Sequence, residues 1–336
     1  MNSHVSTTQS VRDRARGCFL GQLAGDALGS MVEFKSAATI KSLYASGLRE
    51  IGPSTVFDTL PGQPTDDSEL ALALARTLLA DGRFDDEHVA GAYGAWLESG
   101  PFDVGGTIGT ATRAVNEARH AERGLADAAR AAAKEDSEAN GALMRQSPLG
   151  IWGHALDAAM LDATVRADTT LTHPNRICQD ASAAYIVALA AVIHEGLDAR
   201  STYARALTWD REHGASPTVS NALAAATDRA PRYEHHQGHV LVALQNAFYQ
   251  TLHAPTLEEG IIATVMGGGD ADTNAAIAGA LLGALYGEDA LPSQWKEAVL
   301  HCRPEKGAVG VRQPRPEIYW PVDALSLADR LAGVAP

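Results

Sequence analysis

Two acidic segments, far apart in the sequence, contain the side chains best suited to bind metal ions. Their candidate ligands are Thr65, Asp66 and Asp67 in the first segment and Asp270, Asp272 and Thr273 in the second. Each segment leads directly into a strongly apolar stretch, so we expect both to lie at the N-terminus of a helix. Carboxylate and hydroxyl oxygens are the ligands that Mg²⁺, Mn²⁺ and Ca²⁺ prefer, whereas zinc prefers His and Cys. The two segments therefore predict a site for hard divalent cations, with enough oxygen ligands for two ions.

Helix capping is the alternative interpretation of these residues. Asp and Thr are common at helix N-termini, and each residue taken singly is more typical of a cap than of a ligand. One cap needs only one side chain, however, whereas here two pairs of carboxylates must each be solvated or share a cation. Three glycines, Gly267 to Gly269, precede Asp270. Such a run is expected only where the backbone turns sharply or approaches a ligand closely.

Helices must position these segments, because apolar residues recur at intervals of three and four along most of the chain. Clear period-two alternation is hard to find, and Ala and Leu dominate where Val, Ile and Thr would mark strands. Helical or apolar stretches are expected at residues 11–29, 66–79, 86–97, 107–119, 125–134, 148–160, 180–194, around Arg205, and at 219–229, 238–251, 257–266, 271–286 and 322–331. The stretch 180–194 is apolar on nearly all sides, which places it at the centre of a bundle. We therefore predict an all-α fold.

The bulk properties are typical of a soluble globular protein. Hydrophobic residues make up 46% of the 336 residues and charged residues 20%, which is enough apolar material for a sizeable core. No linker or repeat divides the chain, so we predict one helical domain over residues 11–336 after a flexible tail at residues 1–10. The formal net charge of −14 argues against binding to nucleic acid or to anionic lipid.

Cysteine usage and the N-terminal sequence predict a cytoplasmic protein. The three cysteines, Cys18, Cys178 and Cys302, are widely spaced and form no CxxC pair, so they indicate neither a disulfide framework nor a zinc site. The N-terminal residues lack the basic-then-apolar pattern of a secretory signal. We also expect no apolar run that approaches the length of a bilayer crossing, and hence no membrane partner.

Four motifs, in this order along the chain, resemble those of the ADP-ribosylglycohydrolases, including the dinitrogenase-reductase-activating glycohydrolases. They are Gly21–Gly29 followed by Glu33-Phe34, then Thr65–Ser68, then Asn140–Arg145, and Gly268–Thr273 followed by Ala278–Ala280. Together they span nearly the whole chain, and motifs in a shared order are far more specific than any one of them. The resemblance implies a single compact orthogonal multi-helix bundle. It also implies a hydrolase that releases ADP-ribose with the help of two Mg²⁺ or Mn²⁺ ions.

The same resemblance implies roles for individual residues. The ligands of the two ions would be Thr65, Asp66, Asp67, Asp270, Asp272 and Thr273. Glu33 matches an acidic residue that lies at the metal or at the scissile bond in part of the family. Asp103 resembles the acidic residue of a mobile loop that covers the ribose in the bacterial arginine-specific branch. Either Glu33 or Asp66 would act as general acid or base, and the sequence leaves that choice open.

The residues expected to bind the substrate come from a different part of the chain. Ser137, Asn140 and Gly141 match positions that hold the diphosphate and the ribose, and His173 matches a histidine near the ligand. Ala139 departs from the family, since many relatives have Gly before the Asn. Its Cβ narrows the backbone geometry available next to the diphosphate.

Other candidate residues are better explained without a catalytic role. His235, His236 and His239 favour a solvated loop, because transition-metal binding would need further soft ligands or a carboxylate at compatible spacing. Cys178 is more typical of a small buried hydrophobe than of a nucleophile. Trp152 and Tyr185 favour core packing over stacking on adenine. Arg145 is near the expected phosphate site or pairs with an acidic neighbour in the bundle.

The resemblance of Asp103 and of the Glu33-Phe34 pair to the bacterial arginine-specific branch implies a metal-dependent hydrolase that cleaves the N-glycosidic bond of ADP-ribosyl-arginine on a protein and so reverses mono-ADP-ribosylation. Two metal ions would orient the ribose and a water molecule and would offset the carboxylate charge that otherwise repels a diphosphate. The biological role is either removal of a regulatory mark or immunity against an ADP-ribosylating toxin, with an ADP-ribosyltransferase as the expected partner. Three alternatives stay open: another ADP-ribose linkage (serine, nucleobase or O-acetyl-ADP-ribose), a non-catalytic ADP-ribose- or partner-binding protein, and a metal-dependent phosphohydrolase.

Overall fold

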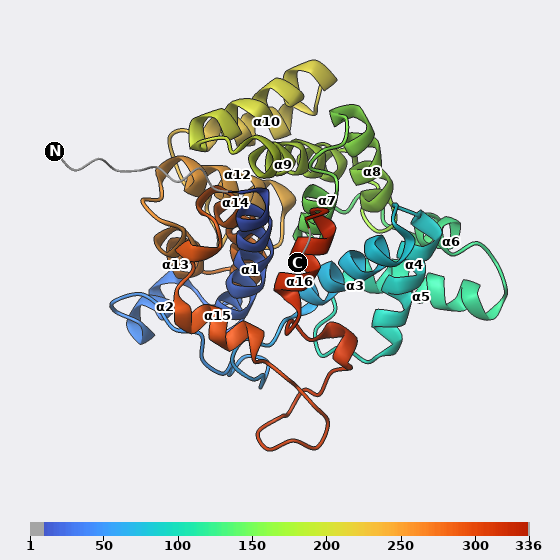
Figure 1. The fold of residues 1–336 in the computed structure, drawn as a ribbon, viewed down its shortest axis with the longest axis horizontal. Helices are drawn as coiled ribbons and strands as arrows, with labels where there is room; N and C mark the ends of the chain where they lie inside the picture. The colour runs from blue at the N-terminus through green and yellow to red at the C-terminus, as the bar shows by residue number, and fades with distance from the viewer. Residues whose placement is uncertain (1–9, 335–336) are drawn as a thin grey trace.

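Helices make up all the regular secondary structure of residues 10–334, the part of the chain that the computed structural model describes, and that part contains no β-strand (Figure 1). The α-helices are α1 (Val11–Gly29), α2 (Ala37–Leu43), α3 (Asp66–Asp81), α4 (Asp86–Glu98), α5 (Gly106–His120), α6 (Leu125–Ala132), α7 (Ser147–Trp152), α8 (Ala158–Thr170), α9 (Arg176–Glu195), α10 (Ala199–His213), α11 (Pro217–Ala225), α12 (Val240–His253), α13 (Leu257–Met266), α14 (Ala271–Tyr286), α15 (Ser293–Leu300) and α16 (Ala324–Leu331). Short 3-10 helices lie at Leu143–Arg145, Glu288–Ala290 and Glu317–Tyr319. The all-α prediction is confirmed. Of the predicted N-terminal tail, residues 1–9 lie outside the described residues, and Ser10 caps α1.

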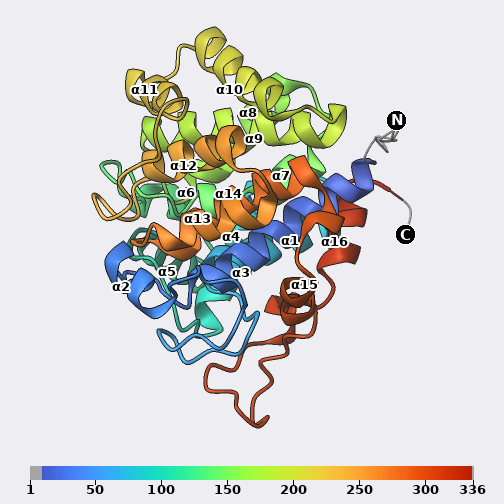
Figure 2. The same cartoon turned by 90° about the vertical axis from the view of Figure 1, so that its left-hand side faces the viewer.

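Helix α1 crosses the middle of the molecule and packs along α14 (Figures 1 and 2). Glycines recur on α1 at every fourth position, at Gly17, Gly21, Gly25 and Gly29. A Cβ at Gly21 would lie 2.1 Å from the carbonyl oxygen of Gly279 on α14, and a Cβ at Gly25 would lie 2.1 Å from that of Ala275. The two backbones are therefore in direct contact, which only small residues allow. We call these α1 positions and the α14 backbone that they touch the glycine seam.

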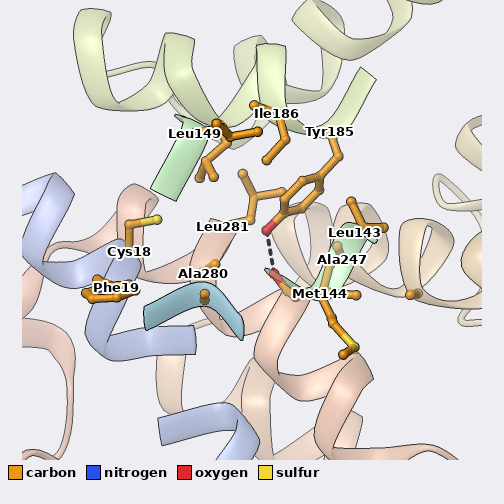
Figure 3. Packing of buried hydrophobic residues seen from close by; sticks show 14 of the residues in the cluster. Cys18, Phe19, Leu143, Met144, Leu149, Tyr185, Ile186, Ala247, Ala280 and Leu281 are labelled. Atoms are coloured by element: carbon orange, nitrogen blue, oxygen red, sulfur yellow. Dashed lines mark hydrogen bonds between the residues drawn. The ribbon is translucent and has the colours of Figure 1, made fainter. Parts of the chain in front are cut away.

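Helix α9 is buried at the centre of the bundle, as its apolar sequence predicted. Its first turn is capped by Asn175, whose Oδ1 accepts a hydrogen bond from the amide of Ile177 at 2.9 Å. Figure 3 shows Tyr185 among apolar neighbours, and its hydroxyl donates to the carbonyl of Ile277 on α14 at 2.6 Å. The predicted core role of Tyr185 is confirmed.

The length and composition of α9 would suffice for a membrane span, and no other described helix passes that test. The expectation that no apolar run approaches this length was therefore wrong. Within the bundle, 83% of the most apolar window of α9 is buried. Other helices surround α9, and a helix that is buried in this way is apolar on all sides.

Several element boundaries differ from those expected. The apolar stretch 148–160 is divided into α7 and α8. Helix α7 ends at Trp152 with Gly153 as its C-cap, and Asp157 caps the start of α8 by accepting from the amide of Ala159 at 3.0 Å. Helices α2 and α15 were missed, and α10 was anticipated only around Arg205. Helices α2 and α15 have only about two turns, so their periodic signal is weak, whereas the equally short α6 and α16 confine their apolar residues more strictly to one face.

A buried ion pair fixes the segment that precedes residue 103. The guanidinium of Arg315 binds Glu69 of α3 through two hydrogen bonds of 2.7 and 2.8 Å. It also donates to the backbone carbonyl of Ser99 at 3.1 Å and to its hydroxyl at 2.7 Å. The chain after residue 303 thereby holds the end of α4 against α3, and the loop 100–106 begins at this point.

Candidate active site

The two acidic segments meet at a pocket of about 290 Å³. The predicted site residues that line it are Glu33, Asp66, Asp103, Asn140, Gly141, His173, Asp270 and Thr273. The predicted residues that do not line it are Thr65, Asp67 and Asp272, which are buried, and Ser137, which is half-buried. Asp67 is connected to the lining, because its Oδ2 accepts from the hydroxyl of Thr273 at 3.4 Å. Ser137 is one residue further out, with its hydroxyl 2.9 Å from that of Thr107 in the wall.

The carboxylates form two groups that share one residue. Oxygens of Asp26, Asp67 and Asp272 lie within 4.8 Å of one another, and so do oxygens of Glu33, Asp270 and Asp272. All five residues are buried. The carboxylates therefore come from four parts of the chain: α1, α3, α14 and the loop after α1. Each part contributes at least one carboxylate to the same small volume.

Helix capping does not explain the side chains at the starts of α3 and α14. Thr65 and Asp270 are the N-cap residues, but in the described structure neither side chain accepts a capping hydrogen bond from a backbone amide of its helix. The Thr65 hydroxyl lies 2.9 Å from Asp26 Oδ1 and 3.0 Å from Asp67 Oδ2. Asp270 Oδ2 accepts from the amide of Asn140 at 2.7 Å. Both side chains therefore point into the cluster. A metal ligand must have this orientation.

Asp26 is a member of the cluster to which the sequence assigned no role. Its carboxylate accepts from the Thr65 amide at 3.1 Å, from the Thr65 hydroxyl at 2.9 Å and from the Ser68 amide at 3.2 Å. It thereby anchors the start of α3 to α1. The available signal was a lone acidic residue among the small residues of the glycine seam, since a fully buried carboxylate needs partners.

The glycine run before Asp270 forms a sharp turn, as predicted. Gly268 and Gly269 have φ values of +74° and +71°, which favour glycine. The carbonyl of Gly269 accepts from the amide of Phe34 at 2.7 Å, and its amide donates to the carbonyl of Lys35 at 3.1 Å. This pairing fixes the loop that carries Glu33 next to the segment that carries Asp270.

Buried acceptors without partners show that the cluster is suited to cations. Among the described residues, Glu33 Oε2 and Asp67 Oδ1 are buried and accept no hydrogen bond, an arrangement that is costly for a carboxylate. Burial, followed by repulsion from Asp103, raises the pKa of Asp66, and burial with repulsion from Asp26 and Asp66 raises that of Asp67. An oxygen-only set with excess negative charge fits Mg²⁺, Mn²⁺ or Ca²⁺ and does not fit zinc.

Protein without bound metal is expected to lose stability as the pH rises from about 6 to about 9. Burial raises the pKa of Asp26 from 3.8 to about 7. Burial is also the main cause of the raised pKa of Glu33, which increases from 4.5 to about 9. Between the ordinary and the raised values the folded protein binds more protons than the unfolded chain. The free energy of unfolding therefore falls as the pH rises through the raised values. Thermal unfolding of chelator-treated protein should show the midpoint decreasing by several degrees over this range.

Divalent cations should reverse this loss. Metal ions take the place of the bound protons, so Mg²⁺ or Mn²⁺ should raise the unfolding midpoint more at pH 9 than at pH 6, with release of protons on binding. A midpoint of the chelator-treated protein that stays constant or increases toward pH 9 would contradict the expected charge of the cluster.

The other candidate residues take no part in the pocket. His235 and His236 are exposed, as the solvated-loop interpretation predicted, and His239 pairs with Glu138 at 2.7 Å. The Cys178 thiol is buried, its pKa is raised to about 12, and it contacts the carbonyl of Ala139 at 3.4 Å. A thiol of this kind is not a nucleophile at neutral pH. Trp152 is half-buried against the core and does not line the pocket.

An all-helical bundle with a pocket beside a buried, oxygen-only carboxylate cluster defines a class of protein whose site is suited to divalent cations. The chain belongs to the ADP-ribosylglycohydrolase family, whose model matches residues 7–335. It is 34% identical to the ADP-ribosyl-[dinitrogen reductase] glycohydrolase of Rhodospirillum rubrum over 297 residues, which cover 86% of this chain and 91% of that protein.

Two further comparisons agree with this assignment. The chain is 29% identical over 305 residues to the ADP-ribosylarginine hydrolase Tri1 of Pseudomonas putida (strain GB-1), covering 87% of this chain and 76% of that protein. A solved structure described as an ADP-ribosylglycohydrolase-related protein complex matches with a TM-score of 0.76 and 28% identity, covering 97% of this chain and 99% of the other. The predicted family and fold type are confirmed.

Proposed function

We propose that this protein is a metal-dependent hydrolase that cleaves the N-glycosidic bond between ADP-ribose and an arginine side chain of a protein. The observation that supports it best is the buried clustering of Asp67, Asp270 and Asp272 with further carboxylates, directly behind a pocket that Asp66 and Asp270 line. Two buried carboxylate oxygens there, Glu33 Oε2 and Asp67 Oδ1, have no hydrogen-bond partner among the described residues. The family assignment supplies the ADP-ribose chemistry. The name of Tri1, an ADP-ribosylarginine hydrolase, supports the linkage.

The ligands of the cations would be Thr65, Asp66, Asp67, Asp270, Asp272 and Thr273, with Glu33 and Asp26 beside them. The carboxylate residues form two clusters that share Asp272. The presence of two clusters supports two bound ions. When bound, such ions supply positive charge that orients the ribose hydroxyls and offsets repulsion between the carboxylates and a diphosphate. Their proposed identity is Mg²⁺ or Mn²⁺.

The chain's own residues bind the sugar and move the proton in this proposal. Asn140, whose amide is fixed by Asp270, and the backbone of Gly141 bind the ribose and diphosphate. Asp103 closes over the ribose from the loop 100–106, which is held to Asp66 by the 3.2 Å bond from the Gly105 amide. Glu33 or Asp66 exchanges the proton with the leaving nitrogen or with water. Burial, followed by repulsion from Asp103, raises the pKa of both carboxyl groups in the protein without bound metal.

Phe34 is placed to recognise the leaving group. It lines the pocket next to Glu33, is 63% exposed, and has a φ of +56°, which is rare for a bulky residue. Exposure and strain together are costly unless the ring has a ligand. A guanidinium binds the face of an aromatic ring more favourably than a neutral serine hydroxyl does, which supports an arginine linkage.

Turnover of defined substrates tests the proposed linkage. The protein with Mg²⁺ is incubated with arginine-, serine- and nucleobase-linked ADP-ribose and with O-acetyl-ADP-ribose, and free ADP-ribose is followed by mass spectrometry. Release from arginine alone, or from arginine fastest, is expected. Turnover of only another linkage would assign a different substrate. Release of phosphate or AMP would indicate a phosphohydrolase, and tight ADP-ribose binding without turnover would indicate a binding protein.

Phe34→Ala should lower kcat/KM for arginine-linked ADP-ribose by about fivefold, the size of one exposed cation–π contact. The affinity for free ADP-ribose should change little, because the product lacks the guanidinium. Phe34→Trp should retain activity. Met160→Ala, which removes a comparably exposed side chain from α8 (59%), is the matched control. An equal loss for free ADP-ribose and for substrate would contradict the assigned contact.

We further propose that the substrate is made by an arginine-specific ADP-ribosyltransferase, either an endogenous regulator or a toxin. Co-expression with such a toxin separates these roles. Protection of the cells by the intact protein, but not by a variant without metal ligands, would support immunity. Absence of protection despite hydrolysis in vitro would favour removal of an endogenous mark.

A further inference from the structure

His173, a residue of the pocket wall, has a buried ring nitrogen without a hydrogen-bond partner among the described residues. The residue is fully buried and lines the pocket, and its Nε2 makes no hydrogen bond. Its ring lies against Gly141, where an added Cβ would be only 3.0 Å from His173 Cε1. The other ring nitrogen, Nδ1, lies 2.8 Å from the hydroxyl oxygen of Thr172. One side of the ring is thus fixed to the protein, and the other has an unpartnered nitrogen at the wall of the pocket.

Behind Thr172 lies a fully buried arginine. Nη1 of Arg145 donates to the Thr172 hydroxyl oxygen at 2.8 Å and to the Gly141 carbonyl at 3.2 Å. Its Nη2 donates to the backbone carbonyl of Asp168 at 3.0 Å and lies 3.2 Å from the carboxylate of the same residue. Its Nε donates to the hydroxyl of Tyr93 at 3.0 Å. All N–H groups of the guanidinium are therefore engaged, and its orientation is fixed.

The aspartate partner is held equally firmly. Asp168 is fully buried, and its carboxylate accepts from the Tyr93 hydroxyl at 2.7 Å and from the Gln146 amide at 2.7 Å. A buried pair with this many hydrogen bonds is costly to break. The charge on Arg145 is therefore permanent, and so is its role as a donor toward Thr172.

The direction of these hydrogen bonds determines where the proton on His173 lies. A guanidinium only donates, so the Thr172 oxygen must accept from Arg145. The hydroxyl proton of Thr172 then has one further partner in the structure, His173 Nδ1. If Nδ1 carried the proton, the buried Thr172 hydroxyl proton would have no acceptor among the described residues, which is costly. Nδ1 is therefore the acceptor, and the proton of the neutral imidazole is on Nε2.

We propose that Arg145 and Thr172 are positioning residues that hold His173 as a neutral imidazole, with its Nε2–H directed at an acceptor oxygen of the ligand. Under the proposed function, on which this choice of ligand rests, the acceptor is an oxygen of the diphosphate or of the distal ribose of ADP-ribose. His173 thus binds the ligand by a directed hydrogen bond without using positive charge.

The electrostatics agree with this assignment. Burial and the nearby charge of Arg145 lower the pKa of His173 to about 3, so the ring stays neutral at physiological pH. A protonated ring would also donate from Nδ1, which would leave the buried Thr172 hydroxyl proton without an acceptor. The arrangement therefore permits only one protonation state and one tautomer.

Nitrogen NMR of the free protein tests the tautomer without any activity measurement. Protein labelled with ¹⁵N-histidine is recorded with and without His173→Leu, which assigns the two ring nitrogens. A non-protonated Nδ1 and a protonated Nε2 are expected in the wild type and in Thr172→Ser. In Thr172→Val the Nδ1 signal should shift or broaden, because its donor is lost. A protonated Nδ1 in the wild type would overturn the proposal.

Binding of ADP-ribose tests the consequence. Thr172→Val should weaken binding measured by calorimetry by about fivefold to tenfold, the size of one misplaced hydrogen bond, and Thr172→Ser should restore it. Thr251→Val is the matched control, since that buried hydroxyl bonds only to its own helix at 2.9 Å. Thr172→Val that folds, as judged by circular dichroism, and binds like the wild type would overturn the proposal.

Comparison of ligands identifies the acceptor oxygen. An equal loss for ADP and for ADP-ribose assigns the diphosphate, and a loss for ADP-ribose alone assigns the distal ribose. The NMR experiment can show the expected tautomer in a protein that does not bind ADP-ribose. That combination would refute the proposed function and leave the positioning role of Arg145 and Thr172 intact. The two failures are therefore distinguishable.

Discussion

Asp272→Asn should lower kcat/KM by about 10³-fold or more while the protein remains folded. Asp272 belongs to both clusters of carboxylate residues, so its substitution removes a ligand from each cluster. A metal that stabilises charge in the transition state contributes several kcal/mol, and about 4 kcal/mol corresponds to this factor. The substitution keeps the shape of the side chain and removes one of several mutually repelling charges. The unfolding midpoint of the metal-free variant should therefore increase.

Metal titration and kinetics with arginine-linked substrate check both parts of this expectation. Asp289→Asn, at an exposed position of the 3-10 helix at Glu288–Ala290, is the control for the loss of a charge alone. Asp66→Ala combined with Asp272→Ala should abolish metal binding and retain the helical circular dichroism spectrum. Retention of wild-type affinity for Mn²⁺ and of activity by Asp272→Asn would show that the cluster is not the metal site.

Gly21→Ala should have the largest effect on folding, at about 3 kcal/mol or more. The added methyl group would lie 2.1 Å from the carbonyl oxygen of Gly279, and the atoms around it are backbone that no rotamer change can displace. The two helices would have to separate along the whole glycine seam. Because α1 contributes Asp26 and α14 contributes Asp272, separation should also weaken the affinity for metal.

Chemical denaturation with and without Mn²⁺ measures this change. Gly124→Ala is the matched control, because that exposed glycine precedes α6 and an added Cβ would meet only Asp127 at an ordinary 3.7 Å. The control should change the free energy of unfolding by less than about 0.5 kcal/mol. A Gly21→Ala protein as stable as the wild type would mean that the helices are less closely packed than the structure shows.

Local chemistry made much of the site predictable. Oxygen side chains at the starts of two apolar helices, and a glycine run that only a sharp turn explains, identified the segments around Asp66 and Asp270. Periodicity identified the helices that contain them. These signals are carried by neighbouring residues, so they are visible without knowledge of the fold.

The remaining parts of the site depend on contacts between distant segments. Asp26 is a single acidic residue in a glycine-rich helix, and only the packing of α1 on α3 shows what it binds. Arg145 and Thr172 are 27 positions apart and meet through a buried network that no spacing rule predicts. The apolarity of α9 reflects burial by other helices, which the sequence alone cannot separate from burial in lipid.

The glycine seam also has a consequence for biosynthesis. Helix α1 leaves the ribosome long before α14, because most of the described helices lie between them in the sequence. Until α14 emerges, α1 has no partner for its small-residue face, and half of the metal ligands do not yet exist. Such long-range pairing is slow to form. A nascent or prematurely terminated chain should therefore lack any partial activity, and newly made molecules should need protection by chaperones until synthesis is complete.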